Sequence, residues 1–230
     1  MKFRDIETLG RRITSCQACP RLREYCESVA KIKRRAYIDE TYWGKPIRGF
    51  GDPRARLHIV GLAPAAHGAN RTGRIFTGDR SGDWLYRALH KAGFANQPTS
   101  VHARDGLQLK DAYISCVARC APPGNKPLPE ELERCTPFLA EELRLLRDTR
   151  VYIALGGIAL NGLWPLLAPG EPRPKFGHGV KVRLPGMGNR TAPARWLLCS
   201  YHPSQQNTFT GRLTEPMFDS VFAQAVRLLR

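Results

Sequence analysis

Four of the seven cysteines are spaced as metal ligands often are. Cys16 and Cys19 form a Cys-x2-Cys pair, Cys120 lies in a loop rich in proline, and Cys135 follows after fourteen intervening residues. An odd number of cysteines argues against a disulfide framework. Thiolates suit zinc or an iron-sulfur cluster, and the spacing alone does not distinguish the two. Cys26, farther along the helix predicted after Cys19, is an alternative ligand.

A second group of chemically capable residues lies in the stretch 61–85, which follows the short apolar run 57–60. The stretch predicts the end of a strand, a long loop containing Phe76 and Asp79, and a helix from Ser81. In an open α/β sheet, ligands bind beside the carboxyl ends of the strands. A loop of this length inside a compact domain is usually functional, although an ordinary surface loop is the alternative.

Two further loops follow predicted strands and contain residues suited to catalysis. Residues 119–127 contain Asn125 behind a rigid run of prolines and glycine, and residues 202–204 begin with His202. An amide can orient a water molecule, and an imidazole N–H can stabilise developing negative charge. Each residue also has an ordinary structural explanation, as a turn residue or a cap. Their convergence at strand ends favours the functional interpretation.

The composition indicates an anionic partner. Lys and Arg number 36 against 20 Asp and Glu, so the formal net charge is +16. Because the basic residues are spread along the chain, we expect a folded basic face rather than a disordered arm. A solvated basic surface without a partner is the alternative.

The length and apolar content favour one domain over residues 1–230. No apolar run approaches the roughly 18 residues of a membrane span, and residues 1–12 have no apolar signal core. We therefore expect no membrane association and a cytoplasmic location.

Strands and helices are predicted to alternate along the chain. We expect strands at 56–61, 112–118, 151–155 and 196–200, and helices at 21–33, 81–92, 129–147, 158–167 and 216–229. The helix from 129 should kink or restart at Pro137, and residues 179–184 should form an exposed hairpin arm in the Gly- and Pro-rich stretch 169–195. Such alternation predicts an α/β fold whose parallel sheet is covered on both faces.

Four motifs, taken in order, resemble those of the uracil-DNA glycosylase superfamily: residues 61–65 (GLAPA), 73–79 (GRIFTGD), 119–125 (RCAPPGN) and 202–204 (HPS). With the four cysteines, the chain is similar to the iron-sulfur type 5, or class b, members. The resemblance implies a three-layer αβα sandwich around a four-stranded parallel sheet. It also implies an N-terminal cluster-binding arm of about residues 1–35 and a [4Fe-4S] cluster on Cys16, Cys19, Cys120 and Cys135, with zinc as the alternative.

The same resemblance implies roles for individual residues. Phe76 would stack on the extruded base, His202 would donate to the uracil carbonyl, Asn125 would hold the attacking water, and Asp79 would support that water or the sugar. The implied catalytic set is Asp79, Asn125 and His202; the substrate-binding set is Gly61, Ala63, Phe76, Cys116 and His202; the DNA-binding set is Ser204, Gln205, Gln206, Asn207 and Arg212.

The chain departs from the resembled pattern at two places. Leu62 and Ala63 stand where other branches have an acidic or amide side chain that activates water. Cys116 stands where an asparagine commonly reads the uracil edge. A site with fewer buried polar groups rejects alternative substrates less strongly. We therefore expect a broader range of deaminated or damaged bases.

The sequence thus predicts a monomeric, monofunctional DNA glycosylase that removes uracil and related bases by hydrolysis and leaves an abasic site. A non-catalytic nucleic-acid-binding module stapled by a cluster or zinc is the main alternative. A nucleotide hydrolase is disfavoured, because no G-x4-G-K-[ST] stretch is present to bind phosphates.

Overall fold

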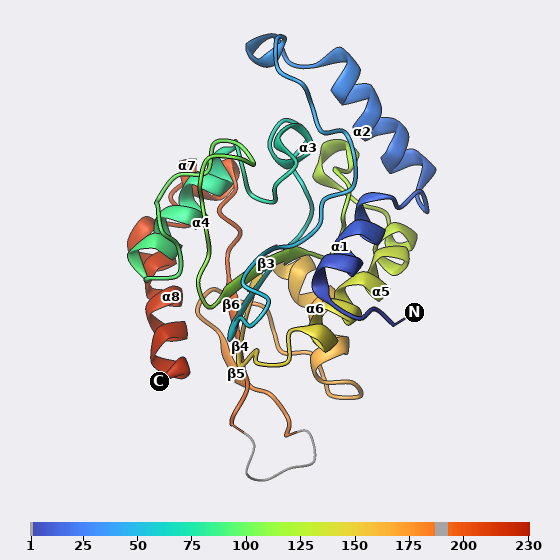
Figure 1. Cartoon of the computed structure of the whole chain (residues 1–230). Coiled ribbons are helices and arrows are strands. Elements are labelled where there is room, and N and C mark those ends of the chain that lie inside the picture. Colours follow the sequence, from blue (N-terminus) through green and yellow to red (C-terminus); the bar gives the residue numbers. More distant parts are fainter. Residues whose placement is uncertain (1, 187–192) are drawn as a thin grey trace.

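The chain is built around a single mixed β-sheet (Figure 1), seen in a computed structural model that describes residues 2–186 and 193–230. The strands lie in the order β1-β3-β2-β4-β6-β5. Their bounds are β1 Phe50–Gly51, β2 Leu57–Gly61, β3 Ala112–Cys116, β4 Val151–Leu155, β5 Lys181–Arg183 and β6 Trp196–Ser200.

The four central strands, β3, β2, β4 and β6, are parallel, as the sequence predicted. The predicted total of four strands is wrong, because in the described part of the chain the sheet has six. The two-residue strand β1 pairs antiparallel with β3, and β5 pairs antiparallel with β6. The predicted arm at 179–184 is therefore the edge strand β5. The segment 187–192 of the predicted irregular stretch lies outside the described residues.

Helices cover both faces of the sheet and confirm the αβα architecture (Figure 1). Helices α4 (Arg80–Lys91) and α8 (Glu215–Leu229) pack on one face through side chains such as Leu89 and Phe222. Helices α5 (Pro129–Leu145) and α6 (Gly157–Leu167) cover the other face, and α1 (Ile6–Thr14) packs on α5. Because β2, β3 and β4 are buried along their whole length, they are apolar almost throughout.

The remaining helices lie near the carboxyl edge of the sheet. They are α2 (Pro20–Ile32), α3 (Ala69–Thr72), α7 (Gln205–Phe209) and the short 3-10 turns Arg35–Tyr37 and Pro123–Asn125. Of the two possibilities predicted at Pro137, a restart is wrong, because α5 continues through Pro137 as one helix; a kink there stays a prediction. Within the described part of the chain, no helix combines the length and apolarity that crossing a membrane requires.

The central strands end in register, which aligns the loops that follow them. Gly61 of β2 pairs with Cys116 of β3, and Leu155 of β4 pairs with Ser200 of β6. The loops after β2, β3 and β6 therefore leave the same edge of the sheet. This edge holds the predicted functional motifs.

Candidate active site

A cavity of about 570 Å³ opens at this edge, between the loops that follow β2, β3 and β6. The three predicted catalytic residues, Asp79, Asn125 and His202, all line it, as do Ala63 and Phe76. Its volume lies within the range of pockets that enclose small organic molecules. The structure thus brings together residues that are far apart in the sequence.

Phe76 and His202 form the aromatic part of the cavity wall. Their ring centroids lie 5.7 Å apart, with 30° between the ring planes. Phe76 is 5% exposed and has a φ of 51°, a left-handed conformation that is costly for an aromatic residue. Strained backbone of this kind persists only where the surroundings enforce it, and it is concentrated at functional sites.

Gly61 and Cys116 lie behind Phe76. A Cβ atom at Gly61 would come within 2.8 Å of the Phe76 ring and 3.1 Å of the Cys116 sulfur. Glycine is thus needed at position 61 to seat the ring. Burial raises the pKa of Cys116 to about 12, so its thiol is neutral. These two residues were predicted to bind substrate. Gly61 lies against the Phe76 ring, Cys116 shares its core cluster, and neither is among the residues that line the cavity.

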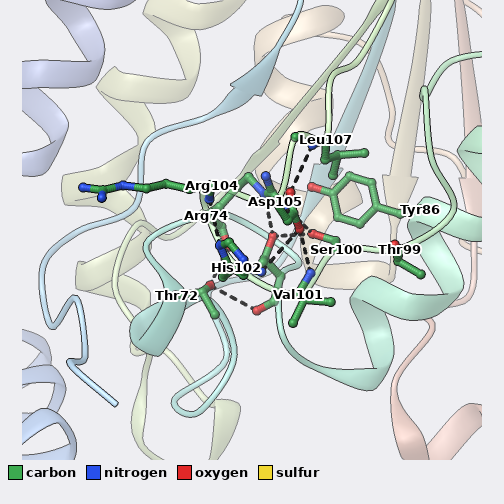
Figure 2. A network of polar contacts seen from close by, with 12 residues as sticks. Thr72, Arg74, Tyr86, Thr99, Ser100, Val101, His102, Arg104, Asp105 and Leu107 are labelled. Atoms are coloured by element: carbon green, nitrogen blue, oxygen red, sulfur yellow. Dashed lines mark hydrogen bonds and ion pairs between the residues drawn. The ribbon is translucent and has the colours of Figure 1, made fainter.

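A buried polar network holds the segment that carries Phe76 (Figure 2). Arg74 forms an ion pair with Asp105 (2.7 Å) and donates hydrogen bonds to Thr77 (2.9 Å) and Ser100 (2.8 Å). The Tyr86 hydroxyl donates to the carbonyl oxygen of Ile75 (2.9 Å). The network therefore fixes the backbone on both sides of Phe76.

Asp105 is the acidic member of this network. Burial by itself would raise its pKa, but the Arg74 guanidinium and the backbone N–H groups of Leu107 and Val101 hold that pKa well below its usual range. Asp105 is thus ionised at neutral pH, and its charge pairs with a guanidinium that is 6% exposed. A partly paired arrangement here would leave a buried charge, which is strongly destabilising.

Asp79 lies at the start of α4, where its Oδ1 accepts a hydrogen bond from the Gly82 amide (3.0 Å). Its other carboxylate oxygen faces the backbone of Gly68, because a Cβ atom there would lie 2.0 Å from Oδ2. Burial raises the pKa of Asp79, and the hydrogen bond from Gly82 offsets part of that rise. The residue is therefore both a helix cap and a cavity-lining carboxylate.

Asn125 reaches the cavity from the 3-10 turn Pro123–Asn125. It is exposed and has a φ of 57°, and the preceding Gly124 has a φ of 60°. Among the described residues, none forms a hydrogen bond with its side-chain amide. The amide is therefore available to a water molecule or a ligand.

His202 follows β6 and is half-buried in the cavity wall. Burial lowers the pKa of its imidazole from 6.5 to about 4, so the ring is neutral at pH 7. A neutral imidazole has one N–H donor. The Asn207 amide donates to the His202 carbonyl oxygen (2.8 Å) and holds the backbone at this point.

The segment predicted to contact DNA after His202 is the short helix α7, not an open loop. Ser204 caps this helix, because its hydroxyl oxygen accepts a hydrogen bond from the backbone N–H of Asn207. Gln205 and Gln206 are exposed on the cavity rim. The Arg212 guanidinium lies over the Tyr201 ring, 4.7 Å from its centroid. Asn207 and Arg212 thus make contacts within the protein and are not among the cavity-lining residues.

The sequence interpretation missed several residues of the cavity wall. Arg80, Ser81 and Lys126 line it beside the predicted residues. Arg80 and Lys126 each follow a nominated residue directly in the sequence, so their charge next to a motif was a usable signal. Phe209 gave no such signal, although it is 67% exposed and stacks on the Arg80 guanidinium at 4.7 Å.

The predicted metal ligands are only partly gathered. Cys19 and Cys120 share one buried cluster with Cys26, and Cys135 is close enough for their charges to influence its thiol. Cys16 packs instead in the neighbouring cluster around Phe138. Within residues 2–186 and 193–230, no group of three or more His, Cys, Asp or Glu side chains has the arrangement of a metal site.

The chemistry around these sulfurs nevertheless fits a thiolate-bound metal. Arg23 is 6% exposed, and its Nε and Nη1 have no hydrogen-bond partner among the described residues. Its guanidinium neighbours Cys26 and Cys120, and Arg134 neighbours Cys19. The buried guanidinium of Arg23 and the exposed one of Arg134 would compensate the charge of thiolates beside them.

Comparison with known proteins agrees with this geometry. Residues 48–226 match the family described as the Uracil DNA glycosylase superfamily. The chain is 54% identical over 222 residues to a type-5 uracil-DNA glycosylase of Mycobacterium tuberculosis, covering 96% of this chain and 80% of that protein. It is 48% identical over 224 residues to a type-5 uracil-DNA glycosylase of Thermus thermophilus, covering 97% and 98%.

A type-4 uracil-DNA glycosylase of Pyrobaculum aerophilum is less similar, at 30% identity over 202 residues that cover 87% of this chain and 83% of that protein. The αβα fold, the cavity at the strand ends and these matches agree with one another. The chain belongs to the uracil-DNA glycosylase superfamily.

Proposed function

We propose that this protein is a monofunctional DNA glycosylase that hydrolyses the N-glycosidic bond of uracil in DNA and leaves an abasic site. The observation that carries this proposal is the convergence of Phe76, His202, Asn125 and Asp79 on one cavity. A glycosylase must rotate a nucleotide out of the duplex and enclose its base between apolar and aromatic walls. The Phe76 ring and the side chains of Leu62 and Ala63 supply such walls.

The leaving base departs as an anion, and His202 is suited to stabilise it. Its imidazole is neutral at pH 7, so it can donate an N–H to the base without first forming an ion pair. Donors placed before reaction where negative charge develops are among the largest contributions to catalysis. His202 can therefore donate this hydrogen bond without first being protonated.

Water addition completes the reaction. Asn125 is neutral, so it orients a water molecule and cannot deprotonate it. The carboxylate of Asp79 lines the same cavity, and its raised pKa makes it a better proton acceptor than an exposed aspartate. Leu62 and Ala63 are apolar, so they provide no second water activator. We propose that base departure runs ahead of water attack, with Asp79 taking the proton late.

Substrate range follows from the same walls. No asparagine lies behind Phe76 to read a uracil edge, since Cys116 occupies that place. We propose that other deaminated or damaged bases are also accepted, because few buried polar groups would be left unpaired by them.

DNA would lie across the rim of the cavity. Arg80, Lys126 and Gln206 stand on that rim, with Phe209 exposed beside Arg80. A second hollow of about 350 Å³ shares Asp79 and Asn125 with the cavity and is also lined by Arg34, Tyr37 and His67. Cations and aromatic rings together suit a nucleic-acid strand. One chain supplies the whole site, so we propose that the protein acts as a monomer, in the cytoplasm where prokaryotic DNA is reached.

We also propose that Cys16, Cys19, Cys120 and Cys135 hold a [4Fe-4S] cluster, with zinc as the alternative and Cys26 as the competing ligand. When bound, the cluster would supply a structural link between the N-terminal arm and the loop that carries Asn125. Because Cys19 and Cys120 are about a hundred residues apart in the sequence, this link closes a long loop. Iron, sulfide and zinc analysis of the purified protein distinguishes the two metals.

The activity is tested with a short duplex that contains one uracil, followed by alkali. Strand scission after alkali, and none before it, is the expected result. A thymine duplex is the matched control, and duplexes with hypoxanthine or xanthine test the wider range. Tight binding without scission would instead support a non-catalytic binding module and would contradict this proposal.

A further inference from the structure

Another hollow, separate from the two beside the active site, lies at the opposite end of the sheet from the active-site cavity. It has a volume of about 730 Å³ and is formed where β2, β4 and β6 begin and where β5 ends. Among the residues that the structure describes, Asp148 is the one acidic residue in its lining, beside six arginines: Arg54, Arg56, Arg147, Arg150, Arg183 and Arg195. None of the residues that line the active-site cavity lies at this end of the molecule.

The arginines of this hollow are gathered in one place with few acidic partners. Buried arginines such as Arg74 and Arg119 are paired with Asp105 and Glu142, whereas exposed arginines elsewhere are mostly scattered. Of the six in the hollow, Arg56 is the one that forms an ion pair among the described residues, with Asp111. The remaining residues, 187–192, contain no Asp or Glu in their sequence. The single carboxylate of Asp148 balances only part of this charge, so the five guanidinium groups repel one another unless a further anion joins them.

The residues that line the hollow indicate what kind of anion it can bind. A guanidinium binds phosphate oxygens through two parallel hydrogen bonds. The described part of the lining includes Pro185, Gly186 and Pro193 and no aromatic ring. Stacking on aromatic rings is how proteins generally hold the bases of single strands. A lining with arginines and without rings therefore suits the backbone of a duplex, contacted without reading its sequence.

The position of the hollow separates it from DNA bound at the active site. Arg150 and Arg195 directly precede β4 and β6, whereas Gly61 and His202 lie at the other ends of the same sheet. Five-residue strands alone span about 17 Å, and the loops at each end add to this. A straight duplex across the cavity rim does not extend to the arginines.

We propose that this arginine hollow binds the backbone of a second duplex DNA segment, so that the protein can bridge two segments and pass directly between them. The proposal rests on the proposed function in one respect, that DNA is the substrate at the first site. It adds a binding site that excision on one short duplex does not use.

The test measures bridging with two short duplexes, one carrying a donor fluorophore and the other an acceptor. The variant is Arg147→Gln with Arg183→Gln, both exposed, and the matched control is Arg12→Gln with Arg104→Gln, also exposed and outside the hollow. Energy transfer should appear with the parent protein and the control. In the hollow variant, the affinity for the second duplex should fall by roughly tenfold or more, and its salt slope should shrink by about 2.

Two further measurements separate the possible failures. Single-turnover excision from one short uracil duplex should be equal in all three proteins, and Arg147→Lys with Arg183→Lys should keep bridging. Absence of excision in the parent would sink the proposed function and leave the bridging result readable. The second site would be overturned if the hollow variant and the control bridged equally. It would also be overturned if the hollow variant lost affinity for duplex RNA but not for duplex DNA.

Discussion

The rings of Phe76 and His202 lie 5.7 Å apart and close one cavity from two separate strand ends. Phe76 comes from the loop after β2, and His202 comes directly after β6. One ring offers an apolar face for a base, and the other offers an N–H for the charge that the base acquires. This pairing places base binding and leaving-group stabilisation side by side.

Asp79 has two roles that substitution can separate. Asp79→Asn keeps an oxygen that can accept from the Gly82 amide, but removes the proton acceptor. We expect this variant to retain its stability and to excise uracil about a hundredfold more slowly. Asp79→Ala should lose rate and also about 1 kcal/mol of stability, because the cap is gone. Single-turnover rates and unfolding curves measure both effects; a parent-like rate for Asp79→Asn would reduce Asp79 to a helix cap.

Histidine burial predicts how stability depends on pH. Burial lowers the pKa of His202 to about 4 and that of His58 to about 3, from 6.5. Between each lowered pKa and 6.5, the unfolded chain binds more protons than the folded chain. The stability that these two histidines contribute is therefore fully present above pH 6.5 and falls as the pH drops toward 4. Denaturant unfolding at pH 7 and pH 5 checks this. His202→Asn should lose less stability than the parent between these two pH values, whereas His102→Asn, at an exposed site, should behave like the parent.

Gly61 seats the Phe76 ring through its missing side chain. Gly61→Ala would place a methyl group 2.8 Å from the ring, so the ring must shift. We expect a loss of about 1 to 3 kcal/mol in stability and weaker binding of the extruded base. Gly186→Ala is the control, because no atom of the described residues lies within 4 Å of the added atom there. Normal excision and stability in Gly61→Ala would show that the Phe76 ring can shift without cost, and would contradict the need for glycine at this position.

The cysteine assignment is tested by comparing Cys16→Ser with Cys26→Ser. We expect Cys16→Ser to lose bound metal, soluble yield and thermal stability, and Cys26→Ser to retain metal. Metal content per chain is the measurement, with Cys199→Ser, a buried strand residue outside the cluster, as the control. The reverse pattern would assign the fourth thiolate to Cys26, which already shares a buried cluster with Cys19 and Cys120.

The sequence predicted the parts of the fold that have a strong local pattern. The parallel strands are runs of buried apolar residues, and each predicted catalytic residue lies in a loop that follows one of them. The edge strand β1 has two residues, too few to show any alternation, and its partner β3 is more than sixty residues away. Helix α7 spans five residues, so it shows no helical period either.

Contacts between distant residues were beyond local patterns. Arg119 precedes Cys120 and resembles any basic surface residue in the sequence, yet it is 2% exposed and paired with Glu142 of α5. The ion pair of Arg74 with Asp105 spans thirty-one positions and fixes the Phe76 backbone. The arginine hollow joins residues from four separate segments. Charges of this kind acquire meaning only when the fold shows which ones are paired.

The most direct measurement is single-turnover removal of uracil from a duplex by His202→Ala beside the parent, at saturating protein. Losing a donor to developing negative charge should raise the barrier by about 2 to 4 kcal/mol, which slows excision about thirtyfold to a thousandfold. Affinity for an abasic-site duplex should stay within about threefold, because His202 is half-buried in the cavity wall and is a neutral side chain rather than one of the cations expected to bind phosphates. Excision by His202→Ala at the parent rate would contradict the assignment of this cavity as the site of base removal.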